Sequence, residues 1–100
     1  MKIDVFFSPA GIGQPDVQGR NVVVIDVLRA TTTIAVALFN GARAVLPAAS
    51  TEEALRMAQN FERDDVILAG ERKSVRITGF ALGNSPLEFT PAVVQGKTIV

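Results

Sequence analysis

The chain has 100 residues, of which 48% are hydrophobic and 20% are charged, a balance typical of a globular protein. Its ten basic and ten acidic residues cancel, which argues against nucleic acid or an acidic membrane surface as a partner. Cysteine and histidine are absent, so the chain offers no disulfide, no thiolate or imidazole metal ligand and no histidine base. No apolar run approaches bilayer length and the N-terminus does not resemble a signal peptide, so we expect a cytoplasmic protein.

The first half of the chain predicts two strands, a loop and a helix. Residues 3–7 are β-prone, and the proline- and glycine-rich residues 8–20 indicate a loop. Residues 22–26 begin with four consecutive β-branched apolar side chains, which is typical of a strand buried on both faces of a parallel sheet. The apolar residues 34–39 predict a helix that ends at the asparagine–glycine pair directly after them.

The second half continues this alternation of strands and helices. Residues 43–46 and 66–69 predict two further short strands. Between them, residues 50–53 match a capping box, and the apolar side chains that follow fall on one face of an amphipathic helix. The alternation predicts the α/β class, with a three-layer, mostly parallel sheet that has helices on both faces.

The last residues indicate that this fold is incomplete. Residues 96–100 predict a turn and the opening of another strand, at which the chain stops. We therefore expect residues 1–100 to form a single α/β domain or the N-terminal fragment of one. As an isolated fragment it should have little or no activity. The sequence leaves homo-oligomerisation open.

A polar cluster follows the strand predicted in the middle of the first half. Asp26 ends that strand and Arg29 follows it. The helix then opens with Thr31, Thr32 and Thr33. Because a helix N-terminus presents free N–H groups and arginine can bind an anion bidentately, this junction predicts a phosphate site. Asp26 would repel phosphate, so it must bring a cation, act as a nucleophile or orient Arg29; alternatively, it only caps the helix.

A second acid–arginine pair, Glu71 and Arg72, comes just after the strand predicted at residues 66–69. If this strand neighbours the one at 22–26, Asp26 and Glu71 meet at the same edge of the sheet. Two carboxylates with water and phosphate oxygens make an ordinary magnesium site. Taken alone, Glu71 is better explained as a solvent-facing loop acid.

A glycine-rich stretch at residues 77–84 contains too many glycines for a regular element and indicates close backbone approaches. It ends at Asn84, and Ser85 with Glu88 then forms a second signature of a helix start. Asn84 and Ser85 therefore either offer hydrogen-bond donors to a ligand or merely satisfy that short helix.

Three stretches of the chain resemble one known family. The sequences IDVLRATTT at residues 25–33, AGER at 69–72 and GFALGNSP at 79–86 are similar to motifs of the 2-phosphosulfolactate phosphatases, in the family's order. The chain departs from the pattern after the second motif, where many relatives have glycines and it has Lys73 and Ser74. Family members are longer and continue into a threonine- and asparagine-rich motif that this chain lacks.

The resemblance implies a magnesium-dependent enzyme of coenzyme M biosynthesis that hydrolyses (R)-2-phospho-3-sulfolactate to 3-sulfolactate and phosphate. Asp26 and Glu71 would hold Mg²⁺, Asp26 and Arg29 would be the catalytic residues, and a basic side chain after Glu71 would meet the sulfonate or carboxylate. The side chains expected to bind the small anionic phosphate ester are Thr31, Thr32, Thr33, Arg72, Asn84 and Ser85.

Two alternatives to this enzyme follow from the same residues. A haloacid-dehalogenase-type phosphatase would carry a second aspartate two residues after its nucleophile, and Leu28 at that position counts against it. A non-catalytic phosphate- or nucleotide-binding α/β module would need the helix start but not the paired acids. Dependence on a metal ion would therefore separate that module from the enzyme.

Overall fold

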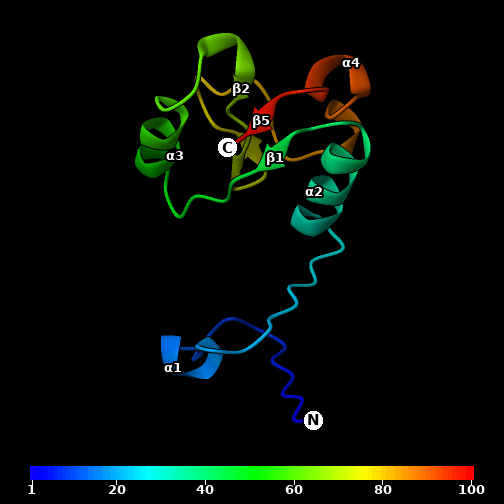
Figure 1. The fold of residues 1–100 in the computed structure, drawn as a ribbon. Coiled ribbons are helices and arrows are strands. Elements are labelled where there is room, and N and C mark those ends of the chain that lie inside the picture. The colour runs from blue at the N-terminus through cyan, green and yellow to red at the C-terminus, as the bar shows by residue number, and fades with distance from the viewer.

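The computed structural model describes every residue from Met1 to Val100 and divides the chain into two regions (Figure 1). Residues 1–28, here called the arm, extend away from the rest and contain one short helix, α1 (Gln14–Val17). Residues 29–100, here called the body, hold every strand and the other helices. The molecule is consequently elongated, with extents of 42 × 26 × 26 Å.

A three-stranded parallel sheet lies at the centre of the body. Its order is β1 (Ala44–Val45), β5 (Thr98–Ile99) and β2 (Val66–Ile67), so the last strand in sequence is the middle one in space. Thr98 pairs with Ala44 on one side and with Val66 on the other. The strands predicted at residues 43–46 and 66–69 are confirmed, as is the strand that opens near the C-terminus.

Helices and turns surround this sheet. α2 (Ala30–Phe39) ends where the sequence predicts, because Gly41 adopts φ +97°, a conformation that side-chain-bearing residues rarely adopt. α3 (Thr51–Ala58) begins at Ser50, whose hydroxyl accepts a hydrogen bond from Glu53 N at 3.1 Å. The remaining elements are the 3₁₀ turns η1 (Arg63–Asp65) and η2 (Pro86–Glu88), the helix α4 (Pro91–Val94) and an antiparallel hairpin of β3 (Glu71–Arg72) and β4 (Val75–Arg76).

Two apolar clusters hold these elements together. Ile99, at the end of the middle strand β5, and Val100, directly after it, belong to different clusters. Ile99 packs in the cluster that includes Ala37 of α2 and Val94 of α4. Val100 packs in the cluster that includes Ala54 of α3. Alternation along a strand places neighbouring side chains on opposite faces. The chain is therefore a mixed α/β protein with a parallel sheet, and a complete three-layer arrangement stays a prediction.

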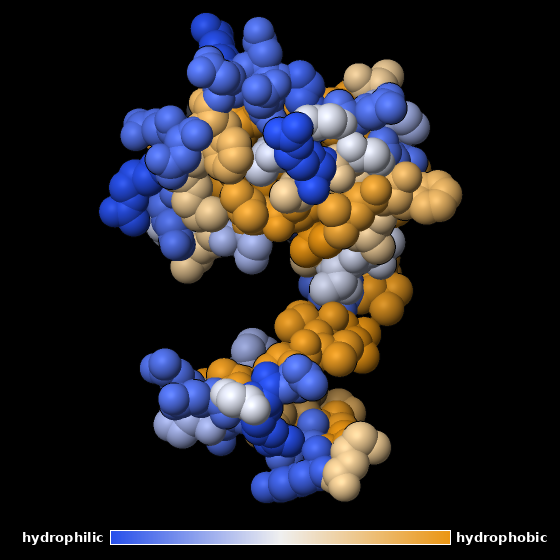
Figure 2. Space-filling model, in the orientation of Figure 1, coloured by the Kyte–Doolittle hydropathy of each residue, from blue (hydrophilic) through white to orange (hydrophobic).

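The arm overturns part of the sequence-based prediction. Residues 3–7 and 22–26 were expected to be strands, the second one buried on both faces, but neither pairs with any strand. Ile25 is 79% exposed, and Figure 2 shows apolar atoms on the surface of the stretch that joins arm and body. The physical reason is that β-branched side chains favour extended backbone, whereas a strand also requires a partner for its N–H and C=O groups.

None of the helices combines the length and the apolar character needed to span a membrane; the longest, α2, has 10 residues.

Candidate functional site: an ion pair at the start of α2

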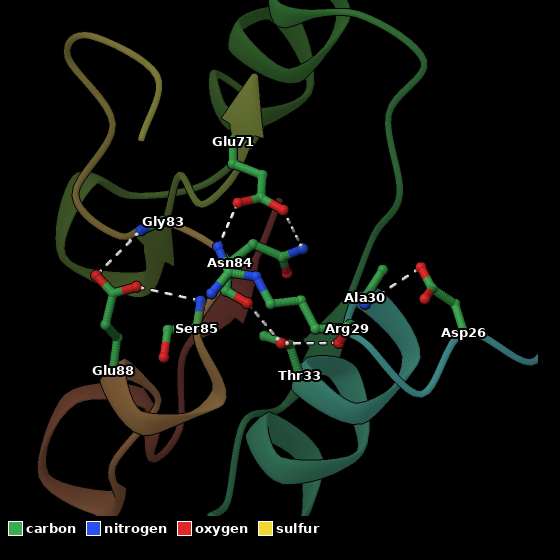
Figure 3. A network of polar contacts seen from close by, with 9 residues as sticks. All are labelled: Asp26, Arg29, Ala30, Thr33, Glu71, Gly83, Asn84, Ser85 and Glu88. Carbon is green, nitrogen blue, oxygen red and sulfur yellow. Dashed lines mark hydrogen bonds and ion pairs between the residues drawn. The ribbon is translucent and has the colours of Figure 1, made fainter. Parts of the chain in front are cut away.

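Arg29 and Glu71 form an ion pair where α2 begins (Figure 3). Arg29 is the N-cap residue of α2, and Glu71 opens β3; the Nη2 atom of Arg29 donates a hydrogen bond to Oε2 of Glu71. Both side chains are partly accessible, with 34% and 24% of their surfaces exposed. The structure thus brings together two of the site residues that the sequence singled out. It pairs them directly with one another, whereas the sequence assigned Arg29 to phosphate and Glu71 to a metal ion.

This pairing shifts both acid–base equilibria toward the charged forms. The hydrogen bond from Arg29, followed by one from Asn84, holds the pKa of the Glu71 carboxyl below its usual value. The hydrogen bond to Glu71 likewise raises the pKa of the Arg29 guanidinium. Glu71 is therefore an anion and Arg29 a cation at neutral pH, which are the charge states that metal binding and anion binding require.

Asn84 reaches Glu71 because two distant stretches of backbone run side by side. Gly70 N donates to Leu82 O at 3.1 Å, and Ala81 N donates to Leu68 O at 3.0 Å. These bonds place Asn84 next to β3, where its Nδ2 atom donates to Oε1 of Glu71 at 3.2 Å. Both carboxylate oxygens of Glu71 thus have a donor, one from an arginine and one from an amide.

The loop that carries Asn84 is itself fixed by Glu88. The Glu88 carboxylate accepts hydrogen bonds from Gly83 N and Ser85 N, each at 3.2 Å. A Cβ atom at residue 83 would lie 3.0 Å from Oε2 of Glu88, so glycine permits this close approach. The main-chain donor of Ser85 is therefore used within the start of η2, as the simpler of the two sequence-based interpretations expects.

Thr33 ties this loop to α2. Its hydroxyl oxygen lies 2.8 Å from Asn84 O and 3.1 Å from Arg29 O, and only 4% of the residue is exposed. One hydroxyl proton can serve either carbonyl, and the shorter contact is the one to Asn84. A buried threonine therefore links the residue that carries the guanidinium to the residue that holds Glu71.

Asp26, Thr31 and Thr32 bond within the turn that leads into α2. The Asp26 carboxylate accepts a long hydrogen bond of 3.4 Å from Ala30 N, while Thr31 Oγ1 contacts both N and O of Asp26 at 2.8 Å. Thr32 Oγ1 donates to Val27 O at 2.6 Å. These two hydroxyl groups face the preceding backbone, and their predicted role as substrate donors stays a prediction.

The two acids predicted to share a metal ion engage different partners. Asp26 is exposed and bonds to the first turn of α2, whereas Glu71 bonds to Arg29 and Asn84. The chain contains no group of three or more acidic side chains gathered as metal ligands. Exposed carboxylate oxygens nevertheless suit Mg²⁺, which commonly takes one or two carboxylates and completes its shell with water and phosphate oxygens. Joint ligation by Asp26 and Glu71 stays a prediction.

A mostly apolar groove of about 300 Å³ lies beside the ion pair. Thr33, Glu71, Arg72 and Asn84 contribute to its lining. Arg72 is exposed, and its Nη2 atom lies 3.5 Å from Thr51 Oγ1 at the start of α3. The groove therefore combines the Glu71 carboxylate, the exposed Arg72 guanidinium and the Asn84 amide in a space that suits a small molecule.

Comparison with known proteins identifies the family to which this site belongs. The family model described as 2-phosphosulpholactate phosphatase matches residues 6–100 of the chain. The chain belongs to this family. The resemblance seen in the three sequence motifs is therefore confirmed.

Individual relatives agree with the family model. A probable 2-phosphosulfolactate phosphatase of Caldanaerobacter subterraneus is 55% identical over 100 residues, which are all of this chain and 42% of that protein. Proteins with the same name from Clostridium beijerinckii and Clostridium perfringens strain 13 are 47% and 45% identical over the whole chain, which covers 42% and 41% of their lengths. The chain thus spans about two fifths of the relatives that it matches.

Two features of the site lay beyond sequence reasoning. The sequence singled out Arg29 and Glu71 separately, for phosphate and for metal, but gave no sign that they pair across 42 positions. The link from Thr33 to Asn84 spans 51 positions and was equally invisible. The helix-start signature at Ser85 and Glu88 was the one local signal, and it identified the contact that fixes the Asn84 loop.

Proposed function

We propose that the full-length protein is a magnesium-dependent phosphatase that hydrolyses (R)-2-phospho-3-sulfolactate to 3-sulfolactate and phosphate, in coenzyme M biosynthesis. Family membership and the names of the relatives support the reaction. The observation that carries the proposal is the Arg29–Glu71 pair beside a small groove. An anion-binding group and a cation-binding group lie side by side, an arrangement that suits transfer of a metal-bound phosphoryl group.

Arg29 is the residue that would bind the phosphoryl group. A guanidinium has five N–H donors, and Glu71 accepts from only one of its terminal nitrogens. The remaining donors can bind phosphate oxygens bidentately while the pair with Glu71 stays intact. Charge that spreads over the phosphoryl oxygens in the transition state would then face a fixed cation.

The start of α2 offers fewer free N–H groups for binding phosphate than the sequence suggests. Thr31 N and Thr33 N donate to backbone carbonyls at 3.2 and 3.0 Å, and Ala30 N donates to Asp26. Thr32 N is the first-turn donor that makes no hydrogen bond within the protein. The helix would therefore add one N–H group to the anion site, and Arg29 would supply most of the binding.

Asp26 and Glu71 are the residues that would hold the magnesium ion, through their carboxylate oxygens. When bound, Mg²⁺ supplies positive charge to the phosphoryl oxygens and lowers the pKa of a coordinated water molecule. Glu71 keeps lone pairs in addition to the two that accept from Arg29 and Asn84. Asp26 has one carboxylate oxygen, Oδ1, that accepts no hydrogen bond.

Arg72 would bind the second anionic group of the substrate. It follows Glu71 directly and lines the same groove, and the one hydrogen bond of its side chain, to Thr51 Oγ1, is long at 3.5 Å. A substrate with a phosphate at one end and a sulfonate or carboxylate at the other would bridge Arg29 and Arg72. This arrangement would disfavour phosphate monoesters that lack a second negative charge.

The test is phosphate release by the full-length protein. Phosphosulfolactate and a panel of neutral-tailed phosphate monoesters are assayed with added Mg²⁺ and with a chelator. We expect turnover of phosphosulfolactate that disappears with the chelator and returns with Mg²⁺. Phosphate binding without turnover, unchanged by the chelator, would instead indicate a non-catalytic binding module.

A further inference from the structure

Four residues, among them Arg29 and Glu71, form a closed circle of hydrogen-bond contacts. The Arg29 side chain bonds to Glu71, and Glu71 bonds to the side chain of Asn84. The main-chain carbonyl of Asn84 contacts the Thr33 hydroxyl, which also contacts the main-chain carbonyl of Arg29 (Figure 3). We call these four residues the ring; they come from α2, from β3 and from the loop before η2.

The ring contacts Arg29 both at its guanidinium and at its main chain. A long, flexible side chain loses rotamer freedom when it is fixed, so a guanidinium that is already held binds its ligand at a smaller entropic cost. Glu71 holds the guanidinium of Arg29. Thr33 N donates to Arg29 O at 3.0 Å, and the Thr33 hydroxyl donates to Asn84 O at 2.8 Å, so Thr33 holds the Arg29 main chain against the loop. The guanidinium and the main chain of Arg29 are thus fixed by two separate sets of contacts.

Thr33 contributes to the wall of the groove, but its hydroxyl group is engaged with the main chain. It is 4% exposed, and both close partners of its hydroxyl are main-chain carbonyls. A donor that is buried and already paired cannot turn to a ligand without leaving a carbonyl unsatisfied, which is energetically costly. Asn84 is engaged in the same way, because its side-chain amide donates to Glu71.

We infer that Thr33 and Asn84 are positioning residues of this site: they do not bind the phosphate ester themselves but hold Arg29 and Glu71 in a fixed relative orientation. The inference rests on the proposed function for its catalytic consequence. The ring itself does not depend on that function. Thr33 and Asn84, which the sequence offered as substrate-binding residues, acquire a different role.

The experiment uses the full-length protein and four variants, three that test the ring and one control. Thr33→Val replaces the hydroxyl by a methyl group of similar size, and Thr33→Ser keeps the hydroxyl. Thr98→Val is the control, because Thr98 is equally buried at 3% exposed and lies in the middle strand, outside the ring. Asn84→Asp replaces the amide donor by a second carboxylate opposite Glu71.

The first measurement is the kinetics of phosphate-ester hydrolysis. A positioning error of about 1 Å can reduce a rate about 100-fold, so we expect kcat to fall about 10- to 100-fold in Thr33→Val and Asn84→Asp, with KM changing little. Thr33→Ser should recover most of kcat, and Thr98→Val should leave it unchanged. A rise in KM at constant kcat in Thr33→Val would contradict the inference, because it would indicate direct contact with the substrate.

The second measurement asks whether Thr33 acts through Arg29. In an Arg29→Ala background, Thr33→Val should cause little further loss of kcat/KM, since a positioning residue has nothing left to position. An equal loss in both backgrounds would overturn the inference.

The third measurement separates this inference from the proposed function. Nitrogen-15 NMR of the Arg29 guanidinium reports hindered rotation when the group is held. We expect hindered rotation in the unmodified protein and in Thr98→Val, and averaged signals in Thr33→Val and Asn84→Asp. If the protein hydrolyses no phosphate ester, the proposed function fails, and these signals still decide whether the ring holds Arg29. Unchanged signals in both ring variants would contradict the inference.

Discussion

The arm and the body contain the same kinds of apolar side chain but place them differently. Val24 in the arm is 72% exposed, whereas Val94 in the body is fully buried. The run around Val24 has four consecutive β-branched apolar residues, more than any strand of the body has. The comparison shows that β-propensity produces an extended backbone and that only a paired neighbour turns it into a strand.

The candidate site lies across the boundary between these regions. Arg29 and Glu71 belong to the body and contact one another, whereas Asp26 belongs to the arm and bonds only to the turn that begins α2. The curated relatives are more than twice as long as this chain. We therefore expect the body to determine anion binding and the arm to contribute fully only in the full-length protein.

The largest effect should come from the body. In the full-length protein, Arg29→Lys should lower kcat/KM about 100- to 1000-fold, because a lysine keeps the charge but loses the fork of donors that faces the transition state. Steady-state hydrolysis of phosphosulfolactate measures this loss. Arg43→Lys, in the segment before β1, is the matched control and should have no effect. Full activity in Arg29→Lys would show that a point charge is sufficient.

The next largest effect should come from the arm. Asp26→Asn keeps the shape of the side chain but removes its charge, so activity should fall about 10- to 100-fold through weaker metal binding. Titration with Mg²⁺ distinguishes the two roles that the sequence leaves open. Recovery at high Mg²⁺ would indicate a ligand, and no recovery at any concentration would indicate that Asp26 attacks phosphorus. Turnover unchanged from the unmodified protein would remove Asp26 from the site.

A third prediction compares burial in the two regions directly. In the 100-residue chain, Val94→Ala should lower the free energy of unfolding by about 2 kcal/mol, whereas Val24→Ala should change it by less than about 0.5 kcal/mol. In the full-length protein we expect Val24→Ala to cost about 2 kcal/mol as well, because residues 22–26 should there find a partner strand. Denaturant unfolding of both lengths checks this. An equally harmless Val24→Ala in the longer protein would show that the arm stays exposed.

The smallest effect concerns two acids that are each paired with an arginine. The hydrogen bond from Arg20 in the arm lowers the pKa of Asp4, and that from Arg29 in the body lowers the pKa of Glu71. Because both values lie below those of the unfolded chain, each pair stabilises the fold fully above the ordinary carboxyl pKa and loses this contribution as the pH falls through the lowered value. Carboxyl NMR titration should show that added salt raises the pKa of Asp4 back toward its ordinary value more than it raises the pKa of Glu71. Equal salt dependence would contradict the difference between the regions.

Sequence reasoning succeeded where the signal was local. The capping serine Ser50, the end of α2 before Gly41 and the short strands near Val45 and Ile67 all follow from spacing and turn chemistry within a few residues. It failed for residues 3–7 and 22–26, because pairing depends on what lies beside a strand, which its own side chains do not encode.

The candidate site, too, could be predicted from the sequence only in part. Arg29 and Glu71 could be selected because each follows an apolar run at a junction, a position typical of functional side chains. Their contact could not, since it depends on the backbone bonds that bring Leu82 beside Gly70 and carry Asn84 to Glu71. The positioning roles that we infer for Thr33 and Asn84 therefore required the three-dimensional arrangement.

We propose that the Arg29–Glu71 pair forms the phosphate-binding part of the site. A crystal structure of the full-length protein soaked with inorganic phosphate and Mg²⁺ tests it most directly. We predict a phosphate ion whose oxygens accept two N–H donors of Arg29 at about 2.8 Å while Glu71 remains paired with that guanidinium. Phosphate bound elsewhere, with no contact to Arg29, would contradict the claim.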